Sequence, residues 1–458
     1  MSYRRRFSAL LVLIFTFLLY LQVARRNART NHGSTEVFNQ TLGVSRSRVR
    51  TLALPRPSLG SGSLHCFPAY FRANVSAKKQ NKWIFTLIII ISGKPQFQEI
   101  FVVNLPERTD RRDAMALMAA ATGLELTFAD GVRGANVLEK ALPPGQRNKN
   151  IQSMGAIGSW RAHMNVLQRL RCPVQENITT ALILEDDLDW DVRIKNQFQK
   201  FAAASQKFTQ PLRHDTRKRL PDQYRPNPEV LGQEPLALSI DDAPLTILPR
   251  ISPYGDDWDV LWLGHTGGEL PSDYATLKYN SNLPPSSLLT LLIPDEDTVP
   301  VPRHLKRHPW AKKTEKFASL YPPHTRVVHE PRGNGGVQAY AVSQRGARRL
   351  LHQFGIEGLT DLWDISLRDF CEGVFIGKEE EKPICATTNP PMMVQYWGGG
   401  DSDIGNIGGG YFRKKGSIMV RYSARLNLKK LLARPSSMAM DDVSGLVDQW
   451  PDDGAGPW

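Results

Sequence analysis

The chain has 458 residues, of which 41% are hydrophobic and 22% are charged, a composition that is typical of a folded protein and excludes a largely disordered one. Its net charge of +13 is concentrated near the N-terminus, because residues 1–96 carry 15 Lys and Arg residues and a single acidic residue, which leaves residues 97–458 close to neutral. Proteins that bind nucleic acid carry their positive charge on the folded binding face, so this distribution argues against nucleic acid as a partner.

An apolar run near the N-terminus predicts a membrane anchor. Residues 7–24, FSALLVLIFTFLLYLQVA, contain no charged residue and would span about 27 Å as a helix, enough to cross a hydrocarbon core. A cleaved signal peptide is the alternative, but its apolar region would be shorter, and LQVARR is a poor cleavage site. We expect residues 1–6, with three arginines, to be a cytoplasmic tail and the rest of the chain to be lumenal.

Residues 25–96 are predicted to form a stalk, because residues 25–60 are rich in Arg, Ser and Pro. A second interpretation concerns residues 44–96. Val44-Ser45 can be encoded as GTGAGT and Gln96 as CAG, which are typical of the two ends of an intron. This segment is therefore also consistent with a retained intron that is translated in frame.

From residue 97 onward, short apolar runs alternate with helical patterns. We expect strands at residues 99–105, 124–131, 180–187, 258–265 and about 335–343, and helices at 108–122, within 153–172 and after 343. Strands that alternate with helices predict an α/β fold with a mostly parallel central sheet. The Pro-, Ser- and charge-rich stretches 205–256 and 271–330 are expected to be long loops, and residues 433–458 to be a disordered tail.

Polar residues stand where the predicted strands end. They are Asn104, Asp130, the run Glu185-Asp186-Asp187, and Gly264-His265. Ligands bind beyond the carboxyl ends of the strands in parallel α/β sheets, so we expect these residues to share one cleft. Adjacent carboxylates suit Mg²⁺ or Mn²⁺ and leave positions for substrate phosphates, although a solvated acidic turn is the simpler explanation of the run taken alone.

Six motifs follow one another along the chain: IFVVNLPERTDRR, ADG, GAIGSWRAH, ALILEDD, WDVLWLGH and GGVQAYAVSQRGARRLL. In this order they resemble glycosyltransferase family 25. The resemblance covers about residues 97–400, and we assign residues 97–432 to a glycosyltransferase domain. It implies a GT-A-like, nucleotide-sugar-binding fold, a UDP-sugar donor that is commonly UDP-galactose, Mn²⁺ (or Mg²⁺) as cofactor, and inversion at the anomeric carbon.

The resemblance also implies roles for individual residues. The acidic DxD-type motif of the fold falls on Glu185, Asp186 and Asp187, with Asp187 as the expected metal ligand and Asp186 beside it. The positions at which the first strand and loop of the family approach the nucleotide fall on Asn104, Arg108, Arg111 and Arg112. Asp130 and His163 match further recurrent positions, for which a turn-forming aspartate and a helix-packing histidine are the alternatives.

An inverting transfer needs a base that takes the proton of the acceptor hydroxyl, and a carboxylate is the usual choice. The segment GLTDLWDISLRDF offers Asp361 and Asp364, with a slight preference for Asp364, and a surface charge ladder with Arg368 is the alternative. A rival acidic pair, Asp401 and Asp403, lies in the glycine-rich run 397–410, which is otherwise read as a flexible connector.

The sequence therefore predicts a single-pass type II membrane glycosyltransferase of the Golgi or endoplasmic reticulum, which moves a hexose to a hydroxyl of a glycan or glycoprotein. A non-catalytic lectin-like or scaffolding protein with the same fold is the alternative. A metal-dependent phosphodiesterase is less well supported, because no further His or Asp ligands follow at close spacing. Cys371 and Cys385 either pair, as a lumenal compartment permits, or remain buried thiols.

Overall fold

The structure is a computed structural model that describes residues 97–143, 153–171, 178–223, 237–270, 289–305, 320–359, 361–377, 381–397, 416–435 and 437–455. The predicted cytoplasmic tail, anchor (7–24), stalk (25–96, with 44–96) and acidic pair Asp401 and Asp403 lie outside these residues. No helix within the described ranges is long and apolar enough to span a membrane.

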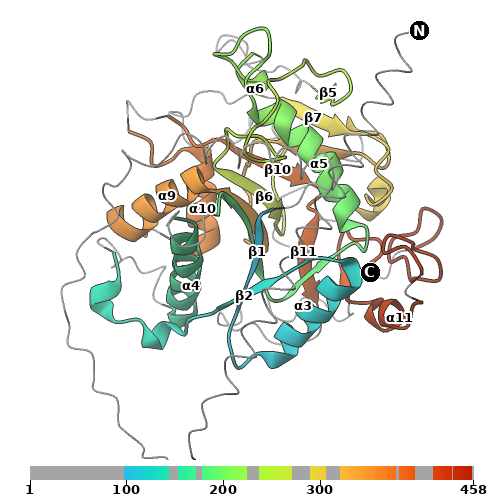
Figure 1. Cartoon of the computed structure of the whole chain (residues 1–458), viewed down its shortest axis with the longest axis horizontal. Helices are drawn as coiled ribbons and strands as arrows, with labels where there is room; N and C mark the ends of the chain where they lie inside the picture. The colour runs from blue at the N-terminus through green and yellow to red at the C-terminus, as the bar shows by residue number, and fades with distance from the viewer. Residues whose placement is uncertain are drawn as a thin grey trace, which may run out of the picture. The chain divides into compact units, whose positions relative to one another are not determined.

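A central sheet organises the described part of the chain, with strand order β2-β1-β3-β9-β6-β10-β8-β7-β5 (Figure 1). These strands are β2 Thr127–Asp130, β1 Glu99–Asn104, β3 Thr180–Glu185, β9 Ala339–Ser343, β6 Val260–Gly264, β10 Cys385–Asn389, β8 Arg326–His329, β7 Thr290–Ile293 and β5 Ala237–Ser239. Strand β9 runs antiparallel to β3 and β6, and β8 runs antiparallel to β10 and β7. The other strands on this path share one direction, as the pairs β1–β2, β1–β3, β6–β10 and β5–β7 are parallel, so the prediction of a largely parallel sheet is confirmed.

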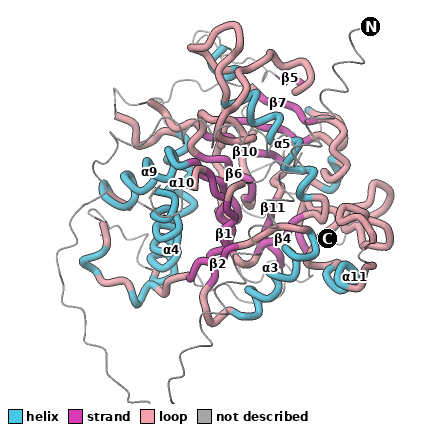
Figure 2. Tube along the Cα trace, viewed as in Figure 1, coloured by secondary structure: helices cyan, strands magenta, loops and turns pink. Residues whose placement is uncertain are grey.

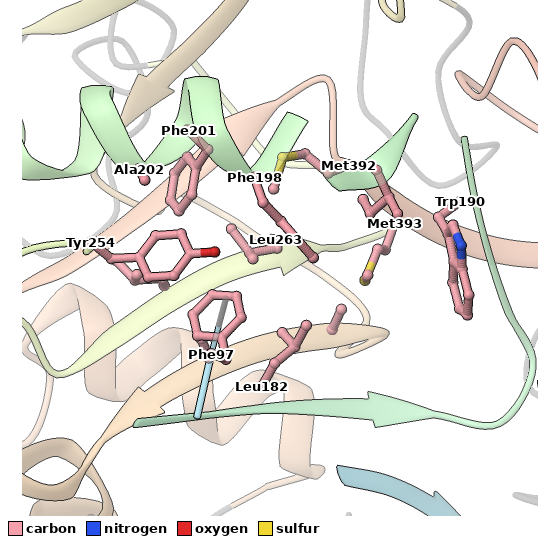
Figure 3. Close-up of a cluster of buried hydrophobic side chains, with 14 of the residues drawn as sticks. Phe97, Leu182, Trp190, Phe198, Phe201, Ala202, Tyr254, Leu263, Met392 and Met393 are labelled. Carbon is pink, nitrogen blue, oxygen red and sulfur yellow. The ribbon is translucent and has the colours of Figure 1, made fainter. Parts of the chain in front are cut away.

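Two apolar cores lie on opposite faces of the sheet, because side chains alternate along each strand. In β1, Ile100 and Val102 belong to one core and Phe101 to the other. The first core, part of which Figure 3 shows, is covered by helices α3 (Thr109–Thr122) and α5 (Ile194–Thr209). The second is covered by α4 (Met154–Arg171), α9 (Gln344–His352) and α10 (Trp363–Glu372), which lie together beside the sheet (Figure 2). This layered arrangement fits the GT-A-like fold that the family resemblance implies.

Local sequence explains where two of these helices begin and end. Helix α3 ends at Gly123, whose φ of 67° lies in the left-handed region that glycine adopts without strain. Helix α9 begins at Ser343, whose hydroxyl accepts a hydrogen bond from the backbone N–H of Gly346. The helix expected at residues 108–122 is therefore confirmed to within one residue, with the turn into β2 set by a single glycine.

A small side ladder extends the sheet beyond the carboxyl end of β3. Strand β4 (Leu188–Trp190) pairs antiparallel with β11 (Met393–Trp397), and β11 pairs with β12 (Gly416–Ser417). The chain from β12 to the short helix α11 (Leu428–Leu432) then packs against β4. Segments more than 200 residues apart in sequence are thereby joined next to the acidic run.

The C-terminal residues correct one prediction. Residues 433–458 were expected to be disordered, yet the described part of this stretch folds onto the domain. Trp450 is fully buried and its Nε1 donates a hydrogen bond to the carbonyl of Ser417 at 3.1 Å. The acidic, Pro- and Gly-containing composition conceals a buried tryptophan, whose apolar area supports the packing. Residues 205–256 also contain more regular structure than expected, since α5 extends to Thr209 and a short helix α6 forms at Leu220–Gln223.

A disulfide joins α10 to β10 through Cys371 and Cys385. This settles the two alternatives for these cysteines in favour of pairing. The bond therefore ties α10 to the central sheet, and α10 is also the helix that carries Asp364.

Candidate active site

A pocket of about 280 Å³ opens at the carboxyl ends of β1, β2 and β3. Its walls are the ends of these strands, the loop after β2 and one face of α4, with the lining residues Val103, Leu105, Arg111, Gly131, Val132, Arg133, Gly134, Ala135, Met154, Gly155, Gly158, Ser159, Ala162, His163, Glu185, Asp186 and Asp187. Glycine lets α4 approach the loop closely, because a Cβ at Gly158 would lie 2.2 Å from the carbonyl oxygen of Val132. Of the residues expected to share one cleft, Glu185, Asp186 and Asp187 line this pocket, whereas Asn104, Asp130, Gly264 and His265 are not among its lining residues.

The acidic run Glu185-Asp186-Asp187 lines this pocket. Asp186 accepts hydrogen bonds from Asn104 Nδ2 at 2.8 Å and from Arg111 Nη1 at 2.7 Å. The same guanidinium nitrogen lies 3.7 Å from Asp187 Oδ2, which also accepts a hydrogen bond from Gln395 at 3.2 Å. The other oxygen of Asp187, Oδ1, is buried and has no hydrogen-bond partner among the described residues. Asn104, Arg111, Asp186 and Asp187 therefore form one connected polar group.

Burial and mutual repulsion perturb the carboxyl groups of this run. The pKa of Glu185 is raised well above 4.5 by burial and by the charges of Asp187, Asp186 and Asp364. Burial also raises the pKa of Asp187, while the positive charge of Arg111 opposes this. The charged forms of these two carboxyl groups are thus disfavoured, and a cation at the pocket wall would relieve the repulsion between them.

The donor atoms of the pocket fit a hard divalent cation in part. Buried Asp187 Oδ1 lacks a partner, and Glu185 lines the same pocket, so two carboxylates can offer oxygen ligands. Both oxygens of Asp186 already accept hydrogen bonds, from Asn104 and Arg111. Within the described ranges, no group of three or more His, Cys, Asp or Glu side chains is arranged to hold a metal ion.

Four residues expected near the nucleotide do not appear among the lining residues of the pocket, namely Asn104, which bonds Asp186, and Arg108, Arg112 and Asp130. Arg108 pairs with Asp110, and Arg112 lies over the ring of Phe128 with its Cζ 4.5 Å from the centroid. Asp130 is exposed at the end of β2. Of the arginines in this segment, Arg111 is the one that lines the pocket, because it occupies the face of α3 that turns toward β3.

His163 lies at the pocket wall and is also packed. Its Nδ1 is 3.1 Å from the hydroxyl of Tyr340, and its ring stacks on Trp363 with centroids 5.2 Å apart. Burial lowers the pKa of His163 to about 3, so its ring is neutral near pH 7. A role at the nucleotide site and a helix-packing role are thus both compatible with the position of His163.

The two candidate bases occupy different environments. Asp364 accepts a hydrogen bond from the backbone N–H of Gly336 at 3.1 Å, and its charge acts on Glu185 in the pocket. Asp361 accepts a hydrogen bond from the backbone N–H of Leu362, and its carbonyl accepts one from the hydroxyl of Ser366. Asp361 therefore shapes the start of α10, whereas Asp364 is electrostatically linked to the acidic run.

Sequence reasoning missed two residues that meet the acidic run from the C-terminal third of the chain. Gln395 of β11 bonds Asp187, and Arg425 donates a hydrogen bond from Nη2 to the backbone carbonyl of Asp186 at 3.3 Å. Asp189 and Asp191, the two acids that follow the run, are both fully buried. The alternation of Leu188 and Trp190 with these acids was a signal for a buried strand, although it does not reveal their distant partners.

Residues 97–226 match the family described as Glycosyltransferase family 25 (LPS biosynthesis protein). We call residues 97–226 the family 25 segment. The family 25 segment contains Asn104, Arg111, His163 and the acidic run, whereas Asp364, Gln395 and Arg425 lie outside it.

Two curated relatives are similar to the same part of the chain. Procollagen galactosyltransferase 1-B of Xenopus laevis is 26% identical over 119 residues, which cover 24% of this chain and 19% of the relative. Procollagen galactosyltransferase 2 of Homo sapiens is 29% identical over 117 residues, which cover 23% of this chain and 18% of the relative. The chain thus spans about a fifth of the length of the curated relatives it matches.

Proposed function

We propose that the protein is a glycosyltransferase that moves a hexose from a nucleotide-sugar donor to a hydroxyl of a glycan or glycoprotein. One observation carries this proposal: the family 25 segment contains the pocket at the ends of β1, β2 and β3 together with its carboxylate run. The names of the two relatives favour galactose as the sugar and a glycoprotein as the acceptor.

The donor would bind with its diphosphate toward Arg111 and the acidic run. Asp187 and Glu185 would hold Mn²⁺ or Mg²⁺, with Asp186 kept in place by Asn104 and Arg111. A divalent cation bound there supplies positive charge to the diphosphate leaving group. Asn104, Arg108, Arg112 and Asp130 would shape the surrounding strand ends and loop rather than contact the sugar.

Asp364 is the proposed base of an inverting displacement. In this step the acceptor hydroxyl oxygen bonds to the anomeric carbon as the bond from that carbon to the diphosphate oxygen breaks, and Asp364 accepts the hydroxyl proton. Its proximity to Glu185 favours it over Asp361, which is engaged in the turn before α10.

The secretory pathway is the proposed location. Residues 7–24 would anchor the chain in a Golgi or endoplasmic reticulum membrane with the domain in the lumen. The disulfide between Cys371 and Cys385 supports this location, because disulfides persist in oxidising compartments.

Incubation of the full-length chain with a panel of nucleotide sugars, Mn²⁺ and glycan or glycoprotein acceptors tests the proposal. We expect donor hydrolysis or transfer, which the double variant Asp186→Ala/Asp187→Ala loses. Activity that survives this double substitution, or no activity with any donor, would favour a lectin-like or scaffolding protein. Cleavage of phosphodiesters without dependence on sugar would indicate a phosphodiesterase.

A further inference from the structure

The segment 416–425 is tied to the strand that follows the acidic run. Asp189 Oδ2 accepts hydrogen bonds from the hydroxyls of Ser417 and Ser423, and Asp189 Oδ1 accepts one from the backbone N–H of Arg425 at 3.1 Å. Backbone hydrogen bonds reinforce the connection, since the N–H of residue 424 donates to the carbonyl of Trp190 at 2.9 Å. The buried carboxylate of Asp189 thus fixes the backbone position from which the side chain of Arg425 extends.

The side chain of Arg425 reaches the acidic run from this position. Its Nη2 donates to the carbonyl of Asp186, and its guanidinium lies 5.0 Å from the ring centroid of Tyr396. Its Nε is buried and has no hydrogen-bond partner within the part of the chain that the structure describes. Among the described residues, the Nε–H of Arg425 therefore has no acceptor.

A second cationic side chain beside Arg111 would help to balance the negative charge around the pocket. Three carboxyl groups, those of Glu185, Asp186 and Asp187, line the wall, and a nucleoside diphosphate would add further negative charge. Arg111 is already hydrogen-bonded to Asp186. A guanidinium binds phosphate oxygens through charge-assisted hydrogen bonds and stays charged at every physiological pH.

We propose that Arg425 is a donor-binding residue whose guanidinium contacts the diphosphate of the nucleotide sugar, and that Asp189, with Ser417 and Ser423, positions it. The proposal rests on the proposed function, because Arg425 contacts the acidic run that lines the proposed donor pocket. It adds that a segment outside residues 97–226 completes the donor site.

The affinities of the full-length chain for UDP and for uridine, both measured by calorimetry with Mn²⁺ present, test the role of Arg425. We expect Arg425→Ala to weaken UDP binding by about tenfold or more, the scale of one lost charge-assisted hydrogen bond, and to leave uridine binding unchanged. Arg425→Lys should retain part of the UDP affinity because it retains the charge. The control is Lys429→Ala, which removes an exposed cation of the following helix α11 and should bind both ligands as the wild type does.

The positioning role has its own variant. Ser417→Ala/Ser423→Ala keeps Arg425 and removes two hydroxyl donors to Asp189, so we expect a several-fold loss of UDP affinity with uridine unaffected. It also provides a test if Arg425→Ala does not fold. Equal losses for UDP and uridine, or unchanged UDP binding in Arg425→Ala and Arg425→Lys, would overturn the inference.

The two proposals fail in different ways. If the wild type transfers sugar and Arg425→Ala binds UDP normally, the inference alone is wrong. If the wild type binds no nucleotide and transfers no sugar, the proposed function fails and the inference fails with it.

Discussion

Two sets of carboxylates stand side by side in the stretch EDDLDWD and do opposite things. Glu185, Asp186 and Asp187 line a pocket, and one oxygen of Asp187 has no partner among the described residues. Asp189 and Asp191 are fully buried and accept hydrogen bonds from the segment 417–425 and from Arg193. The difference shows that residue type and local spacing do not separate an acid available to a ligand from an acid committed to the fold. Partners decide it.

The largest effect is expected when the charge of Asp187 is removed. We expect Asp187→Asn to lower kcat about a thousandfold, because the pocket loses the carboxylate with the uncommitted oxygen, while the melting temperature stays near that of the wild type. Steady-state transfer assays and thermal unfolding measure both quantities. A large fall in melting temperature with little loss of kcat would place Asp187 with the structural acids instead.

The second prediction extends the comparison to Asp364 and Asp361. Asp364→Asn should lower kcat about a hundredfold, since the proton of the acceptor loses its carboxylate base, and Asp361→Asn should change kcat by less than about threefold. Transfer assays with the two variants in parallel decide between them. The reverse order would assign the base to Asp361.

The third prediction concerns the structural acids. Asp189→Ala should lower the free energy of unfolding by about 3 kcal/mol, because it leaves the buried hydroxyls of Ser417 and Ser423 without their acceptor. Urea unfolding measures the change, and Asp453→Ala, which removes an exposed acid, is the matched control. If Asp189→Ala unfolds like this control, Asp189 does not hold the segment.

The smallest expected effect is a pH dependence at Glu185. Because its folded-state pKa is raised well above 4.5, the folded protein holds this proton more tightly than the unfolded chain does. The stability that this proton contributes is fully present below pH 4.5, the ordinary pKa of the group, and is lost as the pH rises through the folded-state pKa. Relative to Glu185→Gln, the wild type should therefore become less stable from pH 4.5 toward neutrality in metal-free buffer. A stability difference that stays constant over this range would argue against the raised pKa.

The fold of the family 25 segment followed closely from the sequence. The runs IFVV and ALIL predicted the strands β1 and β3. Helix α3, which follows β1, begins within one residue of its expected position. Local apolar periodicity carries this information, because a strand buried on both faces needs a continuous apolar run. The C-terminal tail was predicted incorrectly because one tryptophan outweighs an acidic composition once a surface is available to bury it.

The candidate site was predicted in part. Strand ends that share one sheet edge brought Asn104 and the acidic run together, as the parallel order requires. The choice of Arg111 over Arg108 and Arg112 depended on which face of α3 turns toward β3, and the choice of Asp364 over Asp361 depended on how α10 is placed.

By itself, the sequence determined the alternation of strands and helices, the family resemblance and the carboxylates at the end of β3. These features arise from residues that are neighbours along the chain. Tertiary structure alone decided that Ser417 and Ser423 bond Asp189 and that Arg425 bonds Asp186, at sequence separations of 228, 234 and 239 residues. Such contacts form only when the side ladder pairs β4 with β11, and no local pattern encodes which distant donor a buried carboxylate will find.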